Sequence, residues 1–158
     1  MKYSYAPVLL GLALAAAGCG GKKVEINPAT EMVGTRWNAT LATPTQLAGA
    51  VQVKGSGWMG SEKGDTTKTR AFVSIQNAVP GGEHPWHVHV GQCGSDRGIF
   101  GPADAYQPLR VGSNGQAQEM ALLQVSVPTV GQYFINVHAS RNNMKTIIAC
   151  GNLAPPSQ

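Results

Sequence analysis

Short runs of alternating apolar and polar residues, separated by glycine and proline, constrain the fold of this chain most. The clearest run covers residues 69–79, where Ala71, Val73 and Ile75 alternate with polar neighbours before a Pro-Gly-Gly sequence ends it. A period of two is typical of a strand with one buried face. After residue 18, no amphipathic period of 3.6 extends beyond about two helical turns. The pattern therefore predicts strands and not helices.

The other strand signals follow one another at near-regular spacing. They lie at residues 36–41, 48–53, 84–90, 118–127, 133–138 and 146–150. About seven or eight short strands predict an all-β fold, an eight-stranded antiparallel β-barrel or sandwich with Greek-key crossing. Residues 55–67 are expected to form a flexible hairpin-like connection. Residues 91–114 are expected to form a long irregular loop with a role of its own.

Composition limits the class of protein. The chain has 158 residues with 20 Gly, 10 Pro and only 13% charged residues, which excludes a coiled coil, a helical repeat array and a charge-driven disordered chain. The net charge is +4, and no run of Lys and Arg exceeds the pair Lys22-Lys23, so no nucleic-acid partner is expected. One domain, residues 32–158, is the natural division.

The N-terminal segment is predicted to be a signal peptide, residues 1–18. Its apolar core, residues 6–17, is too short to span a bilayer as a mature helix. The core runs into Ala-Ala-Gly-Cys, which resembles a bacterial lipoprotein signal, so Cys19 is expected to carry a lipid. The alternative is an ordinary secretory signal in which Cys19 is incidental. Residues 19–31 are polar and are expected to form a flexible tether.

A lipid on Cys19 would place the protein in the cell envelope. Gly20 after the cysteine resembles outer-membrane sorting, which would face the protein toward the periplasm. In a single-membraned host the same anchor would hold it on the outer face of the cell membrane. Cys93 and Cys150 would then meet an oxidising environment, where a disulfide is expected, worth on the order of 4 kcal/mol for so long a loop. Two buried free thiols are the alternative.

The chain has only four histidines, and two of them share a strand signal. His87 and His89 are separated by Val88, so both imidazoles would point to the same face of a strand. Two imidazoles on one face can bind a borderline metal such as copper or zinc. Two exposed histidines without a metal are the alternative. His84 in the same segment and His138 near the end of another strand signal favour a site.

Several motifs around these histidines resemble the copper/zinc superoxide dismutase family. The segment Glu-His-Pro-Trp-His-Val-His is similar to the family's His-Gly-Phe-His-Val-His segment and is likewise followed by a loop cysteine, Cys93. Further similar segments, in the family's order, are residues 101–102, 106–108, 137–139 and 148–151. The resemblance covers roughly residues 36–153.

The resemblance implies a fold, a cofactor and an activity. It implies an eight-stranded Greek-key β-barrel with a disulfide between Cys93 and Cys150. It also implies that His87, His89 and His138 bind one copper ion per chain and that His84 supports the site from behind. The implied substrate is superoxide, which the family converts to oxygen and hydrogen peroxide. No single oligomeric state is implied, because the family includes monomers and dimers.

The chain departs from the family at the zinc site. Ala105 stands where the family has the histidine that bridges copper and zinc, and no histidine lies between His89 and His138. The loop that carries the zinc ligands is also short. Zinc is therefore not expected. Asp104, beside Ala105, is either a replacement oxygen ligand or an exposed loop carboxylate.

The chain also departs from the family in its charges. The family has an arginine three residues before its last cysteine, which attracts superoxide, and here that position is Ile147. Lys145 and Arg141 are nearby and can supply positive potential, because steering depends on the summed field. They can equally be solvated loop charges. Met59 is a weaker candidate copper ligand.

Two functions remain open. One is a copper-only superoxide dismutase that protects the cell envelope. The other is a non-catalytic copper-binding protein, a carrier or buffer on the same barrel, in which the changes at Ala105 and Ile147 have removed turnover. A metal-free structural barrel is disfavoured, because all of His84, His87, His89 and His138 would then match by coincidence.

Overall fold

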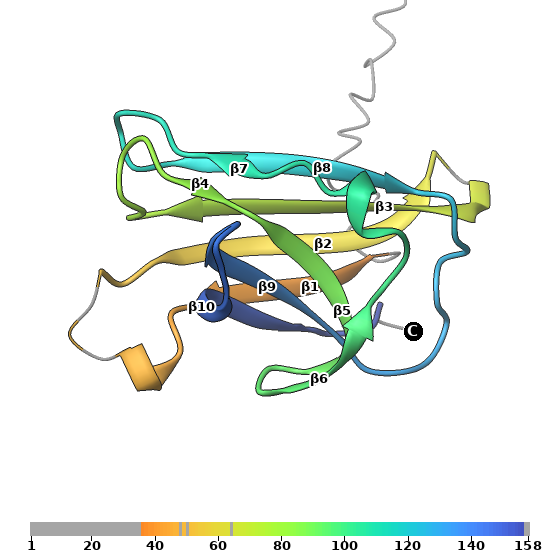
Figure 1. Cartoon of the computed structure of the whole chain (residues 1–158). Coiled ribbons are helices and arrows are strands. Elements are labelled where there is room, and N and C mark those ends of the chain that lie inside the picture. Colours follow the sequence, from red (N-terminus) through yellow and green to blue (C-terminus); the bar gives the residue numbers. More distant parts are fainter. Residues whose placement is uncertain (1–35, 48, 50, 64, 157–158) are drawn as a thin grey trace, which may run out of the picture.

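The protein is an all-β molecule built around one curled antiparallel sheet (Figure 1). The computed structural model describes residues 36–47, 49, 51–63 and 65–156. Among these residues there is no α-helix, and the only helical elements are short 3-10 turns. The predicted all-β, antiparallel, eight-stranded architecture is confirmed.

In the described residues, ten strands and two 3-10 helices make up the fold. The strands are β1 (Trp37–Ala42), β2 (Lys54–Glu62), β3 (Asp65–Gln76), β4 (Glu83–His84), β5 (Trp86–Gln92), β6 (Ser95–Ile99), β7 (Leu109–Arg110), β8 (Ala117–Leu123), β9 (Tyr133–Ser140) and β10 (Asn143–Leu153). The 3-10 helices are η2 (Thr45–Leu47) and η3 (Ala103–Ala105).

The strand order has the crossings of a Greek key. Eight strands form the main sheet in the order β6-β5-β9-β10-β1-β2-β3-β8, and β4 and β7 form a second, two-stranded sheet. The neighbours β5 and β9, and likewise β3 and β8, are not consecutive in the chain, so long connections cross between the two halves. In Figure 1, β8, β3, β2 and β1 run across the picture while β5 crosses them obliquely. The sheet thus curls into a half-barrel around its core.

Alternate residues of the strands fill that core. On β3, Ala71, Val73 and Ile75 are at most 1% exposed, as their alternation predicts. On β5, Trp86 and Val88 belong to the same core cluster. Because successive side chains of a strand point to opposite sides, the residues between them, His87 and His89, face away from this core.

The prediction for the second strand was wrong. The described residues of 48–53 contain no strand, and β2 instead occupies Lys54–Glu62, within the segment expected to be a flexible connection. The glycines of β2 made it resemble a loop. A Cβ on Gly57 would lie 2.4 Å from Ile135 Cδ1, and one on Gly55 would lie 2.2 Å from the Ser74 carbonyl oxygen. These glycines are therefore required by close packing within the sheet.

The prediction of one irregular loop at residues 91–114 was also wrong. This segment contains β6, η3 and β7, and β6 pairs with β5 as a hairpin. Positive φ angles at Gly91, Gly94 and Gly98 shape the hairpin, and its β6 side chains are all exposed. Such a strand lacks the buried alternation by which strands are recognised in a sequence.

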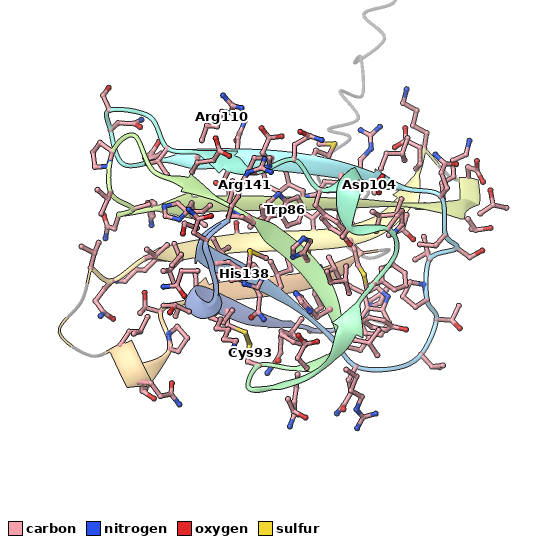
Figure 2. The ribbon with its side chains drawn as sticks, viewed as in Figure 1. Trp86, Cys93, Asp104, Arg110, His138 and Arg141 are labelled. Carbon is pink, nitrogen blue, oxygen red and sulfur yellow. A yellow bond between two sulfur atoms is a disulfide. The ribbon has the colours of Figure 1, made fainter. Side chains whose placement is uncertain are left out.

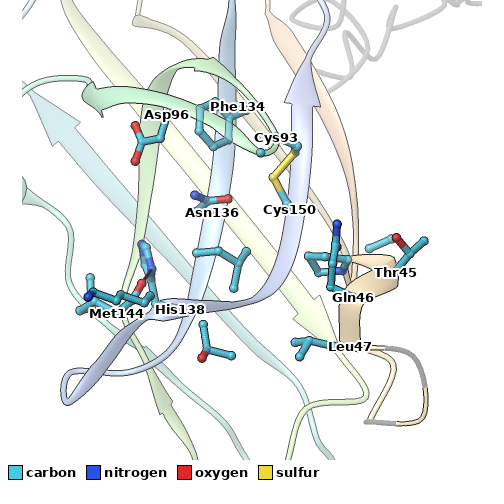
Figure 3. A pocket seen from close by; sticks show the side chains of 16 residues that line it. Thr45, Gln46, Leu47, Cys93, Asp96, Phe134, Asn136, His138, Met144 and Cys150 are labelled. Atoms are coloured by element: carbon cyan, nitrogen blue, oxygen red, sulfur yellow. Dashed lines mark hydrogen bonds between the residues drawn. A yellow bond between two sulfur atoms is a disulfide. The ribbon is translucent and has the colours of Figure 1, made fainter.

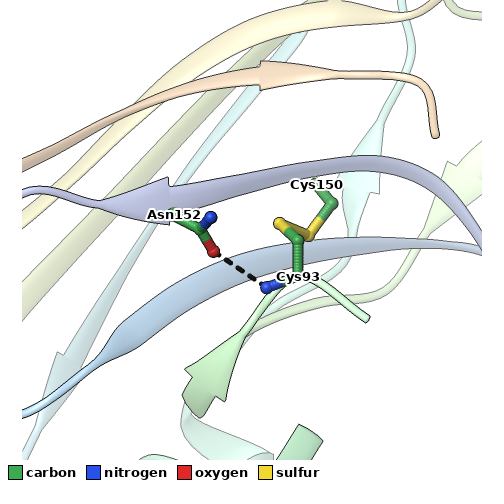
Figure 4. Close-up of a disulfide and its surroundings, with 3 residues drawn as sticks. All are labelled: Cys93, Cys150 and Asn152. Atoms are coloured by element: carbon green, nitrogen blue, oxygen red, sulfur yellow. Dashed lines mark hydrogen bonds between the residues drawn. A yellow bond between two sulfur atoms is a disulfide. The ribbon is translucent and has the colours of Figure 1, made fainter. Parts of the chain in front are cut away.

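The predicted disulfide between Cys93 and Cys150 is present, and their Cα atoms are 6.0 Å apart (Figure 4). The amide of Cys93 also donates a hydrogen bond of 2.8 Å to Asn152 Oδ1. Together they fasten the turn of the β5–β6 hairpin to β10. The predicted signal peptide, the lipidated Cys19 and the tether lie outside the described residues. No helix long and apolar enough to cross a bilayer occurs within the described part of the chain.

Candidate metal centre

Two neighbouring strands bring the three predicted ligands together. His87 and His89 lie on β5, and in the ladder with β9 they pair with Asn136 and Phe134. His138 lies two residues beyond Asn136 on β9, so it shares the face of the sheet that carries the other two imidazoles. The predicted common face of His87 and His89, opposite Val88, is what the structure has.

The three imidazoles form a compact and buried cluster. One candidate ligand atom of each of His87, His89 and His138 lies within 4.8 Å of the others. These three residues are only 7%, 3% and 5% exposed, respectively. The distance between the ring centroids of His87 and His138 is 5.3 Å, and the rings of His87 and His89 are 5.6 Å apart. We call this group the histidine cluster.

Hydrogen bonds assign the proton of two rings. His89 Nδ1 lies 3.0 Å from Asp96 Oδ1, and His138 Nδ1 lies 2.6 Å from the carbonyl oxygen of Met144. Both oxygens can only accept, so each Nδ1 carries the proton when the ring is neutral, and each Nε2 carries a lone pair. His89 Nε2 is buried without a hydrogen-bond partner among the described residues. A buried nitrogen in this state is suited to a metal ion.

The third ring, His87, faces the ring of His138 through Nδ1 and not through Nε2. His87 Nδ1 lies 3.3 Å from His138 Nε2. Metal–nitrogen bonds of about 2.0–2.1 Å place opposed ligands roughly 4 Å apart, so small side-chain movements close the cluster around one ion. Three neutral imidazoles suit copper, zinc, nickel and iron. The histidine cluster can therefore bind a metal ion.

The surroundings favour the neutral form of two of these rings, His87 and His138. Burial, together with the nearby His138 and His89, lowers the pKa of His87 from 6.5 to about 4. Burial also lowers the pKa of His138. Phe134 stacks on His89 with ring centroids 5.1 Å apart, and Tyr106 packs against His87 at 5.2 Å. At neutral pH the lone pairs are thus available to a metal without prior loss of a proton to solvent.

His84 contacts the backbone of the strand that carries His138. Its Nδ1 lies 2.9 Å from the carbonyl oxygen of Ala139 and 3.2 Å from that of His138. It is not one of the clustered ligands. These contacts link β4, which carries His84, to the part of β9 that carries His138. The placement fits the supporting role expected for His84.

An open pocket of about 910 Å³ reaches the cluster from outside (Figure 3). His138, Asp96 and Asn136 line it together with the Cys93–Cys150 disulfide, and η2 stands opposite them. Lys145 and Ile147 also line this pocket. A small solute can therefore approach His138 past a lysine side chain.

The two predicted steering cations have different surroundings. Arg141 Nε donates a hydrogen bond of 3.0 Å to Glu83 Oε1, and Arg110 lies 3.9 Å from the same carboxylate. Glu83 therefore offsets part of the charge of Arg141, which does not line the pocket. Only Lys145 of the two lines the approach to His138.

The remaining candidates lie outside the cluster. Asp104 is exposed on η3, and Figure 2 shows it apart from His138. Ala105 stands where the family that the sequence resembles has its bridging histidine, and it packs against the apolar core. Met59 is fully buried and belongs to the apolar core cluster, from which His87 and His89 face away. Among the described residues the group of closely spaced ligand atoms contains histidines only.

Three residues of the site were missed in the sequence. They are Asp96, the carbonyl of Met144 and the ring of Tyr106, all described above. A backbone carbonyl leaves no mark in a sequence, and an aromatic residue in a loop is not specific. Asp96 did leave a signal, since it lies between Gly94 and Gly98, each two residues away, as expected of a hairpin. Comparison of the chain with protein-family models and with curated proteins finds no match.

Proposed function

We propose that this protein is a copper-dependent superoxide dismutase-like protein of the copper-only kind. The observation that carries the proposal is the buried histidine cluster, in which His87, His89 and His138 offer lone pairs to one ion. The Greek-key fold, the Cys93–Cys150 disulfide and His84 behind the site agree with the family that the sequence resembles.

The chemistry of the donor set supports copper. Among the divalent first-row metals, copper binds most tightly to imidazole nitrogen. The cluster contains no thiolate, which argues against a structural zinc site. Bound copper would supply the one-electron redox chemistry by which superoxide is converted to oxygen and hydrogen peroxide. One copper per chain is expected. Zinc is not, because Ala105 and the described residues around it offer no second cluster of ligands.

The residues of the chain would bind the ion, exclude bulk water from it and admit a small anion. Phe134 and Tyr106 cover the rings, while the pocket beside His138 leaves one side open. Lys145 at this pocket supplies positive potential where an anion enters.

A metal-binding and activity experiment tests the proposal. The copper-loaded protein should carry one copper per chain by elemental analysis and should consume superoxide in pulse radiolysis faster than chelated copper. H138A should lose both properties, and D104A, a change at an exposed carboxylate, should keep both. A folded wild type that binds no copper, or that binds zinc in two-metal stoichiometry, would contradict the proposal.

A second candidate function has an observation in its favour. Arg141 is ion-paired to Glu83 and Ile147 is apolar, so only Lys145 of the expected cations lines the pocket. Weak attraction for superoxide favours a non-catalytic copper carrier or buffer. Stoichiometric copper binding without turnover in pulse radiolysis would identify that function.

The proposed location is the cell envelope, with the chain anchored through a lipid on Cys19. The disulfide supports an oxidising compartment. Labelling of cells with radioactive palmitate, compared between the wild type and C19S, tests the anchor.

A further inference from the structure

The β5–β6 hairpin folds a carboxylate back onto one of the clustered histidines. Gly91 pairs with Asp96 and Gln92 pairs with Ser95, and the register shifts between Gly91 and His89. This shift brings Asp96 toward the face of β5 that carries His89. A Cβ on Gly91 would lie 2.2 Å from the Ser95 carbonyl oxygen, and its φ is +116°, so the hairpin can close in this way only with glycine there.

The backbone holds the carboxylate in this orientation. Asp96 Oδ1 accepts a hydrogen bond of 2.7 Å from the amide of Gly98 and lies 3.0 Å from His89 Nδ1. The side chain is 50% exposed, whereas that of His89 is 4% exposed. Asp96 Oδ1 is thus a hydrogen-bond acceptor held in place at the edge of a buried cluster.

We propose that Asp96 is a positioning residue that holds the proton of His89 on Nδ1 and thereby presents the bare Nε2 to the metal ion. This inference rests on the metal centre of the proposed function. A neutral imidazole in water favours the tautomer with the proton on Nε2, which would block the ligand atom. A fixed carboxylate at Nδ1 reverses that preference and makes the ring a stronger donor.

A purely structural role for Asp96 is less consistent with its surroundings. The hairpin is already fastened to β10 by the Cys93–Cys150 disulfide and by the hydrogen bond from Cys93 to Asn152. The contact of Asp96 with His89 adds little to that attachment, since its carboxylate is half exposed. Its distinctive partner is the one ring of the histidine cluster whose other nitrogen is buried without a hydrogen bond among the described residues.

Two readouts test the proposal, and one of them needs no metal. Long-range ¹H–¹⁵N spectra of the metal-free protein at pH 8 report which nitrogen of His89 carries the proton. The wild type should show it on Nδ1, and D96A should show a mixture or the Nε2 form. Competition with a chelator should show a Cu(II) affinity lowered about 10- to 100-fold in D96A.

Two further variants separate positioning from general damage. In D96N the amide oxygen can still accept the proton of His89, so the tautomer should be retained and the loss of Cu(II) affinity should be smaller than in D96A. D104A removes an exposed carboxylate outside the cluster and should match the wild type in both readouts. The thermal midpoints of all variants should lie close to that of the wild type.

Two results would overturn the proposal. One is a wild-type protein with the His89 proton on Nε2, and the other is a D96A protein whose His89 spectrum and Cu(II) affinity both equal those of the wild type. A third result is possible, in which the wild type binds no Cu(II) but D96A still loses the Nδ1 tautomer of His89. That result would refute the metal centre alone. The control of the tautomer by Asp96 would then still be supported.

Discussion

Individual hydrogen bonds determine what each histidine of the cluster can do. The protons of His89 and His138 are directed to Asp96 and to the Met144 carbonyl, so their Nε2 atoms face the centre of the cluster as lone pairs. Beyond the cluster, the same reasoning separates the two nearby cations. Lys145 lines the pocket, whereas Arg141 is paired with Glu83.

The two cations should therefore differ in their effect on superoxide consumption. We expect K145A to lower kcat/KM for superoxide about two- to five-fold at low ionic strength, because one charge near the entrance is removed from the attracting field. R141A should change it less, since Arg141 does not line the pocket through which the anion enters. Pulse radiolysis at several salt concentrations measures both, and equal effects of the two variants would contradict the assignment.

Acid should destabilise the metal-free protein through His87. Its pKa is lowered from 6.5 to about 4 in the folded state, so between these values the unfolded chain binds a proton that the folded chain does not. The free energy of unfolding should therefore fall as the pH is lowered from about 6.5 toward 4. Above pH 6.5 the titration of His87 should leave the free energy of unfolding unchanged.

Thermal unfolding of the protein in a metal chelator, measured from pH 8 to pH 4, checks this expectation. H87N lacks the titrating ring, so its midpoint should decline less steeply over the same interval. Parallel declines in H87N and the wild type would show that other groups cause the acid sensitivity.

At the scale of elements, β2 shows how glycine can belong to a strand. Gly57 pairs with Ala39 on β1 and with Val73 on β3, so both of its neighbours are fixed. A Cβ there would lie 2.4 Å from Ile135 Cδ1 and 2.7 Å from the Phe72 carbonyl oxygen. The side chain of Ile135, from β9, and the backbone of Phe72 thus occupy the space that a side chain at Gly57 would need.

The substitution G57A should therefore destabilise the protein by about 1–3 kcal/mol, because the methyl group forces backbone or core side chains apart. G112A is the matched control. A Cβ there would lie 3.1 Å from the end of the Asn114 side chain, which can rotate, and 3.6 Å from the Gln116 carbonyl oxygen, an ordinary contact distance. Urea unfolding followed by tryptophan fluorescence compares the two, and equal stabilities would refute the packing argument.

Sequence patterns predicted the strands in which apolar and polar side chains alternate. They failed for strands whose position depends on close backbone contacts between distant segments. The strands β3 and β5 could be predicted because Ala71, Val73 and Ile75, or Trp86 and Val88, reach one core. The strand β2 could not, since the need for Gly57 depends on Ile135 from a distant strand. The histidines of the site were predictable from spacing and scarcity, but the contact of Asp96 with His89 depends on the hairpin register and on Gly91, which only the folded chain defines.

At the scale of the whole molecule, one covalent link joins regions that are distant in the chain. The Cys93–Cys150 disulfide closes a loop of 57 residues, which includes β6, β8 and β9 and the ligand His138. It joins the β5–β6 hairpin to β10, and Asn152 reinforces the same junction. The hairpin that carries Asp96 is thereby fixed to the strand next to His138.

Loss of this link should lower the stability of the whole domain. We expect the double variant C93S/C150S to be about 4 kcal/mol less stable than the oxidised protein, because the unfolded chain regains the entropy of the open loop. Urea unfolding measures the difference. The wild type in reductant should approach the variant, and a wild type indifferent to reductant would contradict the expectation.

Successive side chains of β5 point to opposite sides of the sheet, so substitutions on this strand have two separate kinds of effect. Trp86 and Val88 face the core, and substitutions there affect folding, whereas His87 and His89 face the other side and affect the ion. Ligands on such a strand can be gained or lost in evolution with little change to the barrel. A designer could likewise exchange the imidazoles for other donors, at positions 87, 89 and 138, and ask the same scaffold to select a different metal.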